Sequence, residues 1–177
     1  MFKLTKVVVH KYKSIETDQT FAVEPDVTIL VGMNESGKTS ILEAIAKSNY
    51  FTSDDEFKYN TTHDYPRKEK KRMDKEGEVK KAITCDYSIN ESLRREINRE
   101  LGDNTFSMEN MTISYNYNNR RVYENFVVNP DPLYSKIAHT AGDTDGSIKA
   151  DIAKIKKKTE FAAFLKREDI LEKAEEL

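Results

Sequence analysis

Short apolar runs near the N-terminus predict β-strands. Residues 2–10 contain Leu4 and three consecutive valines, and residues 20–23 form a second run after a polar link. β-Branched side chains of this kind are favoured in strands. Residues 27–31, Val-Thr-Ile-Leu-Val, make a third run that is apolar almost throughout, a pattern typical of a strand buried on both faces. We therefore expect three strands before residue 32.

Helical spacing replaces the strand pattern shortly after this third run. In residues 40–48, apolar side chains recur three and four positions apart, which predicts an amphipathic helix. Residues 49–79 then become polar, aromatic and charged, and they contain Pro66 and Gly77. Because these two residue types interrupt regular structure, we interpret residues 49–79 as an irregular charged insertion.

Regular patterns return after this insertion. Residues 82–89 suit a strand, and the next apolar positions have helical spacing: Leu93, Ile97 and Leu101. Asn90 or Ser92 is suited to cap this helix at its start, and Gly102 is suited to end it.

A β-hairpin and a helical tail are predicted for the rest of the chain. Residues 111–117 and 121–128 are strand-like runs joined by Asn118 and Asn119, and asparagine tolerates the left-handed backbone of a tight turn. Residues 133–177 form an amphipathic helical tail. Its apolar positions are Ile148, Ile152, Ile155, Phe161, Phe164, Leu165 and Leu171, with an interruption at residues 156–158.

Composition describes one soluble domain. The chain has 177 residues, of which 37% are hydrophobic and 34% are charged, so a modest apolar interior lies under a strongly charged surface. No run approaches the roughly 18 apolar residues that a membrane-spanning helix needs. The N-terminus also lacks the apolar core of a signal peptide, and we expect a cytoplasmic protein without membrane contact.

Charge and cysteine content exclude several kinds of site. The 29 basic and 31 acidic residues give a net charge of −2, so any contact with DNA has to be local. The best candidate is the basic run that includes Lys70, Lys71 and Arg72, although such runs are usually solvated loops. Cys85 is the only cysteine, and the three histidines are scattered, so no zinc-ligand spacing is present.

The strongest motif lies between the third strand and the first helix. Residues 32–39, Gly-Met-Asn-Glu-Ser-Gly-Lys-Thr, match the phosphate-binding pattern G-x-x-x-x-G-K-[ST]. In this pattern the backbone N–H groups converge on the β-phosphate, and the following helix directs its positive end to the same place. A strand before the loop and a helix after it are the required context. The motif therefore predicts binding of a purine nucleoside triphosphate, namely ATP with Mg²⁺.

Each position of the loop has an expected role. Lys38 is the candidate catalytic residue and should bridge the β- and γ-phosphates, while Thr39 should place its hydroxyl on Mg²⁺. Ser40 should contact the nucleotide near the α-phosphate. The remaining residues expected to line the phosphate path are Asn34, Glu35, Ser36 and Gly37.

Two segments carry a resemblance to a known family. Residues 11–15, Lys-Tyr-Lys-Ser-Ile, together with residues 30–45, resemble the N-terminal part of SMC/RecF-like ABC ATPases. The loop sequence Asn-Glu-Ser-Gly-Lys-Thr-Ser is most similar to the loops of ATPases of the overcoming-lysogenisation-defect (OLD) nuclease type and of related prokaryotic antiphage defence ATPases. The resemblance covers about residues 1–48 and implies an α/β P-loop NTPase fold: part of an ABC-type ATPase head, with an antiparallel β-subdomain beside a parallel core sheet.

The resemblance also implies a mechanism. In these families ATP is sandwiched between two heads, which form a homodimer or higher oligomer, and hydrolysis opens the clamp. This cycle is coupled to DNA or to a fused or associated nuclease. Lys13 matches the basic residue that often follows the first strand, so it is expected to approach the nucleotide or DNA, although it is also consistent with an ordinary exposed lysine.

Several expected motifs are missing from the sequence. There is no apolar strand ending in Asp-Glu, for which residues 83–86 are the nearest imitation, and there is no Leu-Ser-Gly-Gly signature. The only glutamine, Gln19, precedes the loop, so the usual downstream glutamine is also absent. We consider Asp64 a substitute near Mg²⁺ and Arg67 a phosphate contact, although both also suit ordinary loop residues.

The simplest interpretation is that residues 1–177 are the N-terminal part of a split ABC-type head. A C-terminal lobe would then complete it, and hydrolysis by this part alone should be weak. Two alternatives remain: a P-loop kinase acting on a small molecule, and a non-catalytic module in which ATP only joins subunits. The two strands predicted before the P-loop strand disfavour the kinase.

Overall fold

The computed structural model describes residues 2–50, 55–142, 146–155, 160 and 164. The chain divides into two compact units. The first contains Met1–Asn90 and Glu109–Phe126, and the second contains Glu91–Met108 and Val127–Leu177.

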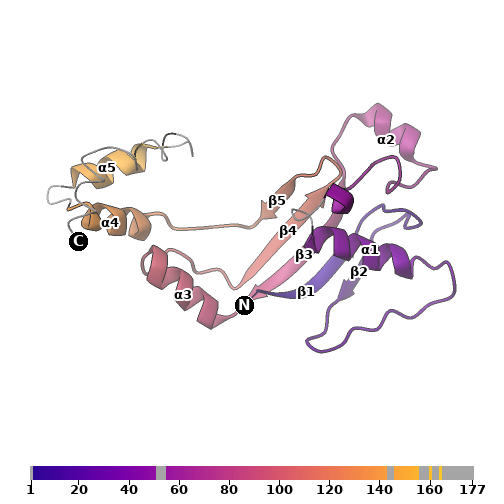
Figure 1. The fold of residues 1–177 in the computed structure, drawn as a ribbon, viewed down its shortest axis with the longest axis horizontal. Helices are drawn as coiled ribbons and strands as arrows, with labels where there is room; N and C mark the ends of the chain where they lie inside the picture. The colour runs from indigo at the N-terminus through magenta and orange to yellow at the C-terminus, as the bar shows by residue number, and fades with distance from the viewer. Residues whose placement is uncertain (1, 51–54, 143–145, 156–159, 161–163, 165–177) are drawn as a thin grey trace. The chain divides into compact units, whose positions relative to one another are not determined.

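A five-stranded antiparallel sheet forms the basis of the first unit (Figure 1). Its strands are β1 (Phe2–Val9), β2 (Gln19–Ala22), β3 (Lys81–Ile89), β4 (Asn110–Asn116) and β5 (Arg121–Glu124). They lie in the order β2-β1-β3-β4-β5, and each neighbouring pair is antiparallel. The antiparallel part of the predicted fold is therefore confirmed, whereas the strands described here include no parallel core sheet.

Helix α1 (Lys38–Asn49) covers one face of this sheet (Figure 1). Val7 of β1 lies opposite Cys85 of β3, and both side chains are fully buried, as is Ala44 of α1. Ser48 Oγ of α1 lies 3.8 Å from Cys85 Sγ. The helix predicted from residue 40 is confirmed, and it begins two residues earlier, inside the glycine loop.

Residues 27–31 do not form the predicted buried strand. They have no ladder partner among the described residues, and the exposed fractions of Val27, Ile29 and Val31 are 68%, 77% and 89%. A buried strand needs neighbouring strands and a covered face, but residues 27–31 do not belong to the five-stranded sheet, and their apolar side chains are left in solvent. The prediction of a buried strand at residues 27–31 is therefore wrong.

Residues 49–79 contain more order than predicted. A 3₁₀ turn, η1 (Asp55–Phe57), and a helix, α2 (Lys70–Glu76), lie within this segment. Its described buried residues include Tyr59, Asp64, Tyr65, Pro66 and Met73. The interpretation as an irregular insertion is therefore wrong at these positions, because its aromatic residues contribute to the core.

The hairpin formed by β4 and β5 was predicted correctly at its turn. Asn119 has φ +58°, in the left-handed region. Its side chain also holds Tyr59: the Tyr59 N–H donates to Asn119 Oδ1 at 2.8 Å, and Asn119 Nδ2 donates to the Tyr59 carbonyl at 3.0 Å. The second strand is shorter than expected, since β5 ends at Glu124, before Asn125 with φ +61°.

The described part of the second unit contains the helices α3 (Glu91–Leu101), α4 (Asp131–Thr140) and α5 (Ser147–Lys154). Helix α3 begins directly after Asn90 and ends directly before Gly102, as predicted. Gly102 has φ +108°, and a Cβ at this position would lie 2.8 Å from the Pro132 carbonyl oxygen. Only glycine fits such a position without a backbone shift.

An apolar cluster forms the core of this second unit. It consists of Ala138, Ala141, Ile148, Ile152 and Phe164, with Ile155 packed against it. The predicted apolar face of the tail is confirmed for Ile148, Ile152 and Ile155. Phe161, Leu165, Leu171 and residues 156–158 lie outside the described residues.

Candidate nucleotide-binding site

The glycine loop leads directly into the first turn of α1. Gly37 precedes the helix with φ +91°, and Lys38 is the first helical residue. The first turn contains no acidic side chain, so its unpaired N–H groups and the positive end of the helix dipole are not neutralised from within the turn. This arrangement suits an anionic ligand.

Two glycines of the loop occupy positions that a larger residue would disturb. A Cβ on Gly32 would lie 2.6 Å from Ser36 Oγ, and a Cβ on Gly37 would lie 3.4 Å from Ile15 Cγ1 and Ser14 Oγ. The positive φ of Gly37 adds a conformational reason for glycine. The requirement for glycine is therefore conformational at Gly37, whereas at Gly32 an added Cβ would require the Ser36 side chain to move.

Lys38 folds back over this loop. Its Nζ donates to the carbonyl oxygens of Gly32 at 2.7 Å and Met33 at 2.6 Å. Both bonds are exposed to solvent. The ammonium group therefore lies at the mouth of the loop, where it can exchange carbonyl oxygens for phosphate oxygens.

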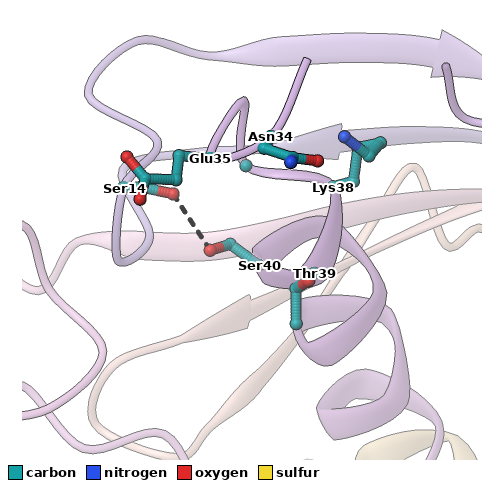
Figure 2. A pocket seen from close by; sticks show the side chains of 7 residues that line it. Ser14, Asn34, Glu35, Lys38, Thr39 and Ser40 are labelled. Carbon is teal, nitrogen blue, oxygen red and sulfur yellow. Dashed lines mark hydrogen bonds between the residues drawn. The ribbon is translucent and has the colours of Figure 1, made fainter. Parts of the chain in front are cut away.

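A cleft of about 540 Å³ lies at this loop. Figure 2 shows the side chains around it. Its lining residues are Ser14, Asn34, Glu35, Gly37, Lys38, Thr39 and Ser40. Six of the seven were predicted from the motif, and Ser36 is the one predicted loop position that does not line the cleft.

Ser14 is the lining residue that the sequence did not identify. It follows β1 rather than the loop, and its Oγ lies 3.1 Å from Ser40 Oγ (Figure 2). The only signal available was its place beside Lys13 in the segment that resembles SMC/RecF-like ATPases. Its hydroxyl brings a second part of the chain to the cleft.

Lys13 itself does not line the cleft. Its Nζ forms an ion pair with Glu43 of α1 and lies 5.7 Å from the centre of the Tyr12 ring. Its backbone has φ +50°, and its N–H donates to the Asp64 carbonyl at 2.6 Å. A contact between Lys13 and nucleotide stays a prediction, and it would require the pair with Glu43 to open.

Asp64 lies in a buried position away from the lining residues. Its side chain is 3% exposed and accepts hydrogen bonds from Lys47 Nζ at 2.6 Å and the Asn60 N–H at 2.8 Å. Tyr12 Oη is 3.3 Å from the other carboxylate oxygen. Burial and the charge of Asp64 both raise the pKa of Tyr12 above its ordinary value. These contacts favour a structural role, and the proposed approach of Asp64 to Mg²⁺ stays a prediction.

The basic run forms a helix in place of the predicted loop. In α2, Lys70 pairs with Asp74 at 3.1 Å and Arg72 pairs with Glu76 at 2.8 Å. Two of the three candidate DNA contacts are therefore already neutralised by neighbours one helical turn away, which lowers the local positive charge. Arg67 is exposed and does not line the cleft.

Residues 83–86, the segment most similar to a magnesium-binding strand, also have other contacts. Asp86, in β3, accepts a hydrogen bond from Thr112 Oγ1 at 2.7 Å and lies 3.7 Å from Lys6 Nζ. Within the described part of the chain, no group of three or more His, Cys, Asp or Glu residues is placed to hold a metal ion. Thr39 at the cleft remains the candidate metal ligand.

Comparison with known protein families decides the class of this site. The model of an AAA domain family matches residues 6–177, nearly the whole chain. The chain belongs to this AAA domain family. It is a P-loop ATPase family related to the SMC/RecF-like ATPases, so ATP binding and the α/β P-loop class agree with the loop geometry.

No curated protein matches the chain. Among the described residues, none of the helices has the length and apolar character needed to cross a lipid bilayer.

Proposed function

We propose that this AAA domain binds Mg²⁺–ATP in the cleft at the glycine loop and forms the nucleotide-binding part of an SMC/RecF-type ATP clamp. One observation carries the proposal: Lys38, Thr39 and Ser40 occupy the first turn of α1 and line the same cleft. The family membership supports nucleotide use in general. The clamp mechanism rests on the sequence resemblance.

The residues around the cleft fit this ligand. Lys38 Nζ already lies at the loop mouth, on exposed carbonyl oxygens, and would transfer to β- and γ-phosphate oxygens. The Thr39 hydroxyl would serve as a Mg²⁺ ligand, and the paired hydroxyls of Ser14 and Ser40 would contact the phosphate chain near its inner end. Mg²⁺, when bound, neutralises part of the phosphate charge and polarises the bond to be cleaved.

The exposed segment of residues 27–31 supports a partner for this domain. We propose that the C-terminal lobe of the same head supplies a strand beside it and thereby a parallel core sheet. An apolar side chain that moves from water into such a sheet contributes about 1.5–3 kcal/mol, so covering Val27, Ile29 and Val31 would stabilise the complete head substantially.

Hydrolysis is expected to be weak in this part of the head. The carboxylates first considered for magnesium, Asp64 and Asp86, are engaged in the core and on the sheet. An opposing head would have to complete the site. We propose that the clamp acts on or near DNA, through a nuclease, repair or OLD-like defence activity, since that is the function of the families the loop resembles.

Nucleotide titration tests the proposal directly. Isothermal titration of the full chain with ATP and MgCl₂ should give saturable binding, which Lys38→Ala should weaken by at least roughly tenfold through loss of a charge-assisted phosphate contact. Light scattering should then detect dimers only with ATP. Robust phosphate release by the chain alone would contradict the expectation of weak hydrolysis, whereas ATP-dependent dimers without any release would favour the non-catalytic alternative.

A further inference from the structure

Glu35 places a carboxylate in the cleft that is proposed to hold a polyanion. It lines the cleft, and its side chain extends from the loop toward Ser14 (Figure 2). Two lysines close to the lining residues are engaged elsewhere: Lys38 with the carbonyl oxygens of the loop, and Lys13, next to Ser14, with Glu43. No ion pair between described residues includes Glu35. Among the described residues its carboxylate therefore has no ion-pair partner.

The backbone of Glu35 is also in an unfavourable conformation. Its φ is +64°, in the left-handed region that glycine adopts without strain and that most other residues avoid. A glycine would remove both the strain and the charge. Residues held in such sparsely populated conformations are concentrated at functional sites.

The charge of this side chain has a predictable effect on nucleotide binding. A bound Mg²⁺ cancels about two of the negative charges of a triphosphate. Because electrostatic repulsion grows with the product of the two charges, a nearby carboxylate penalises the metal-free nucleotide more than the metal-bound one. No contact between the carboxylate and the metal is needed for this discrimination.

We propose that Glu35 selects the Mg²⁺-bound form of the nucleoside triphosphate over the metal-free form by repulsion at the rim of the cleft. The proposal rests on the proposed function, in which the cleft binds ATP and Thr39 is the candidate metal ligand. It adds a specificity role to a residue that the motif marks only as part of the loop.

Titration of the Glu35→Gln variant of the 177-residue chain tests this role. ATP is titrated once with MgCl₂ and once with EDTA, at low ionic strength, and the two Kd values are compared with those of the unmodified chain. We expect the variant to bind metal-free ATP roughly tenfold more tightly and Mg²⁺–ATP only about two- to threefold more tightly. The gain for metal-free ATP should shrink at high salt, because exposed charges are screened.

Two further variants test whether the discrimination comes from the charge of Glu35. One also removes the backbone strain at this position, and the other changes the net charge of the protein at a different position. Glu35→Gly removes both the charge and the strain, and it should reduce the discrimination between the two nucleotide forms as Glu35→Gln does. Glu24→Gln removes an exposed carboxylate that does not line the cleft, so its discrimination should equal that of the unmodified chain.

The outcomes are distinguishable. An unchanged ratio of the two Kd values in Glu35→Gln overturns the proposal. Weaker Mg²⁺–ATP binding with unchanged metal-free binding also overturns it, because Glu35 would then be a metal ligand and not a source of repulsion. If the unmodified chain binds neither form of ATP, the proposed function itself is wrong, and this role fails with it.

Discussion

Lys47, near the C-terminal end of α1, donates a 2.6 Å hydrogen bond to Asp64, and the two side chains are 17% and 3% exposed. The same aspartate uses its backbone carbonyl to accept from the Lys13 N–H at 2.6 Å. Tyr117 Oη lies 3.1 Å from that carbonyl. Asp64 therefore connects the helix that begins at the glycine loop to the turn that carries Lys13 and Ser14.

Asp64→Ala should destabilise the first unit strongly. The substitution leaves the Lys47 ammonium largely buried without a counter-charge, which typically costs about 3–5 kcal/mol. Urea denaturation followed by circular dichroism measures the change. Asp74→Ala, which breaks the solvent-exposed pair with Lys70, should cost less than about 1 kcal/mol. Equal costs in the two variants would contradict the structural role of Asp64.

Gly102→Ala and Gly77→Ala should reduce the free energy of unfolding by different amounts. Both glycines directly follow a helix, and both have a positive φ. At Gly77, with φ +66°, an added Cβ meets nothing within 4 Å, so only the conformational penalty of about 1 kcal/mol applies. At Gly102 the Cβ would lie 2.8 Å from backbone of Pro132, so the total should exceed about 2 kcal/mol. Thermal denaturation of both variants tests the order, and a larger loss at Gly77 would contradict the described packing.

Ser14→Ala should weaken ATP binding and cost only about 1 kcal/mol or less of stability. Its exposed hydroxyl contributes a contact to the cleft and one hydrogen-bond partner to Ser40, so we expect a loss of about three- to tenfold in affinity. Thr17→Ala removes an exposed hydroxyl that does not line the cleft and serves as the control. Unchanged affinity in Ser14→Ala would show that the hydroxyl does not reach the nucleotide.

Glu76 should make the region of α2 sensitive to acid. The hydrogen bond from Lys80, and to a lesser extent the one from Arg72, lowers the pKa of its carboxyl from the ordinary 4.5 to about 2. A lowered pKa in the folded state means that the stabilisation is fully present above pH 4.5 and is lost as the pH falls toward 2. Hydrogen exchange of the α2 amides between pH 5 and pH 2.5, corrected for intrinsic rates, should show this loss in the unmodified chain. Glu76→Gln should flatten that dependence, and an identical profile in both would contradict it.

The glycine loop could be predicted because its information is local. Eight consecutive residues define the phosphate-binding pattern, and the helix that follows is visible from its own apolar spacing. The turn at Asn119 and the helix end at Gly102 were predicted for the same reason. In each case a single residue type satisfies a backbone conformation that its neighbours specify.

The errors concern contacts between distant segments. Residues 27–31 have a strand composition, but burial depends on a neighbouring strand that composition does not supply. Residues 49–79 appeared irregular, because the partners of their buried side chains come from elsewhere, including Lys47 for Asp64 and Asn119 for Tyr59. Ser14 was missed because its link to Ser40 spans 26 positions of the sequence.

The exposed segment at residues 27–31 also affects how the protein behaves in concentrated solution. Val-Thr-Ile-Leu-Val has high β-propensity and contains no charge and no proline, which is the composition of segments that stack into cross-β aggregates. Pro25 and Asp26 stand before it as residues that hinder such stacking. The C-terminal lobe that is proposed to cover this segment would therefore also protect the protein from self-association.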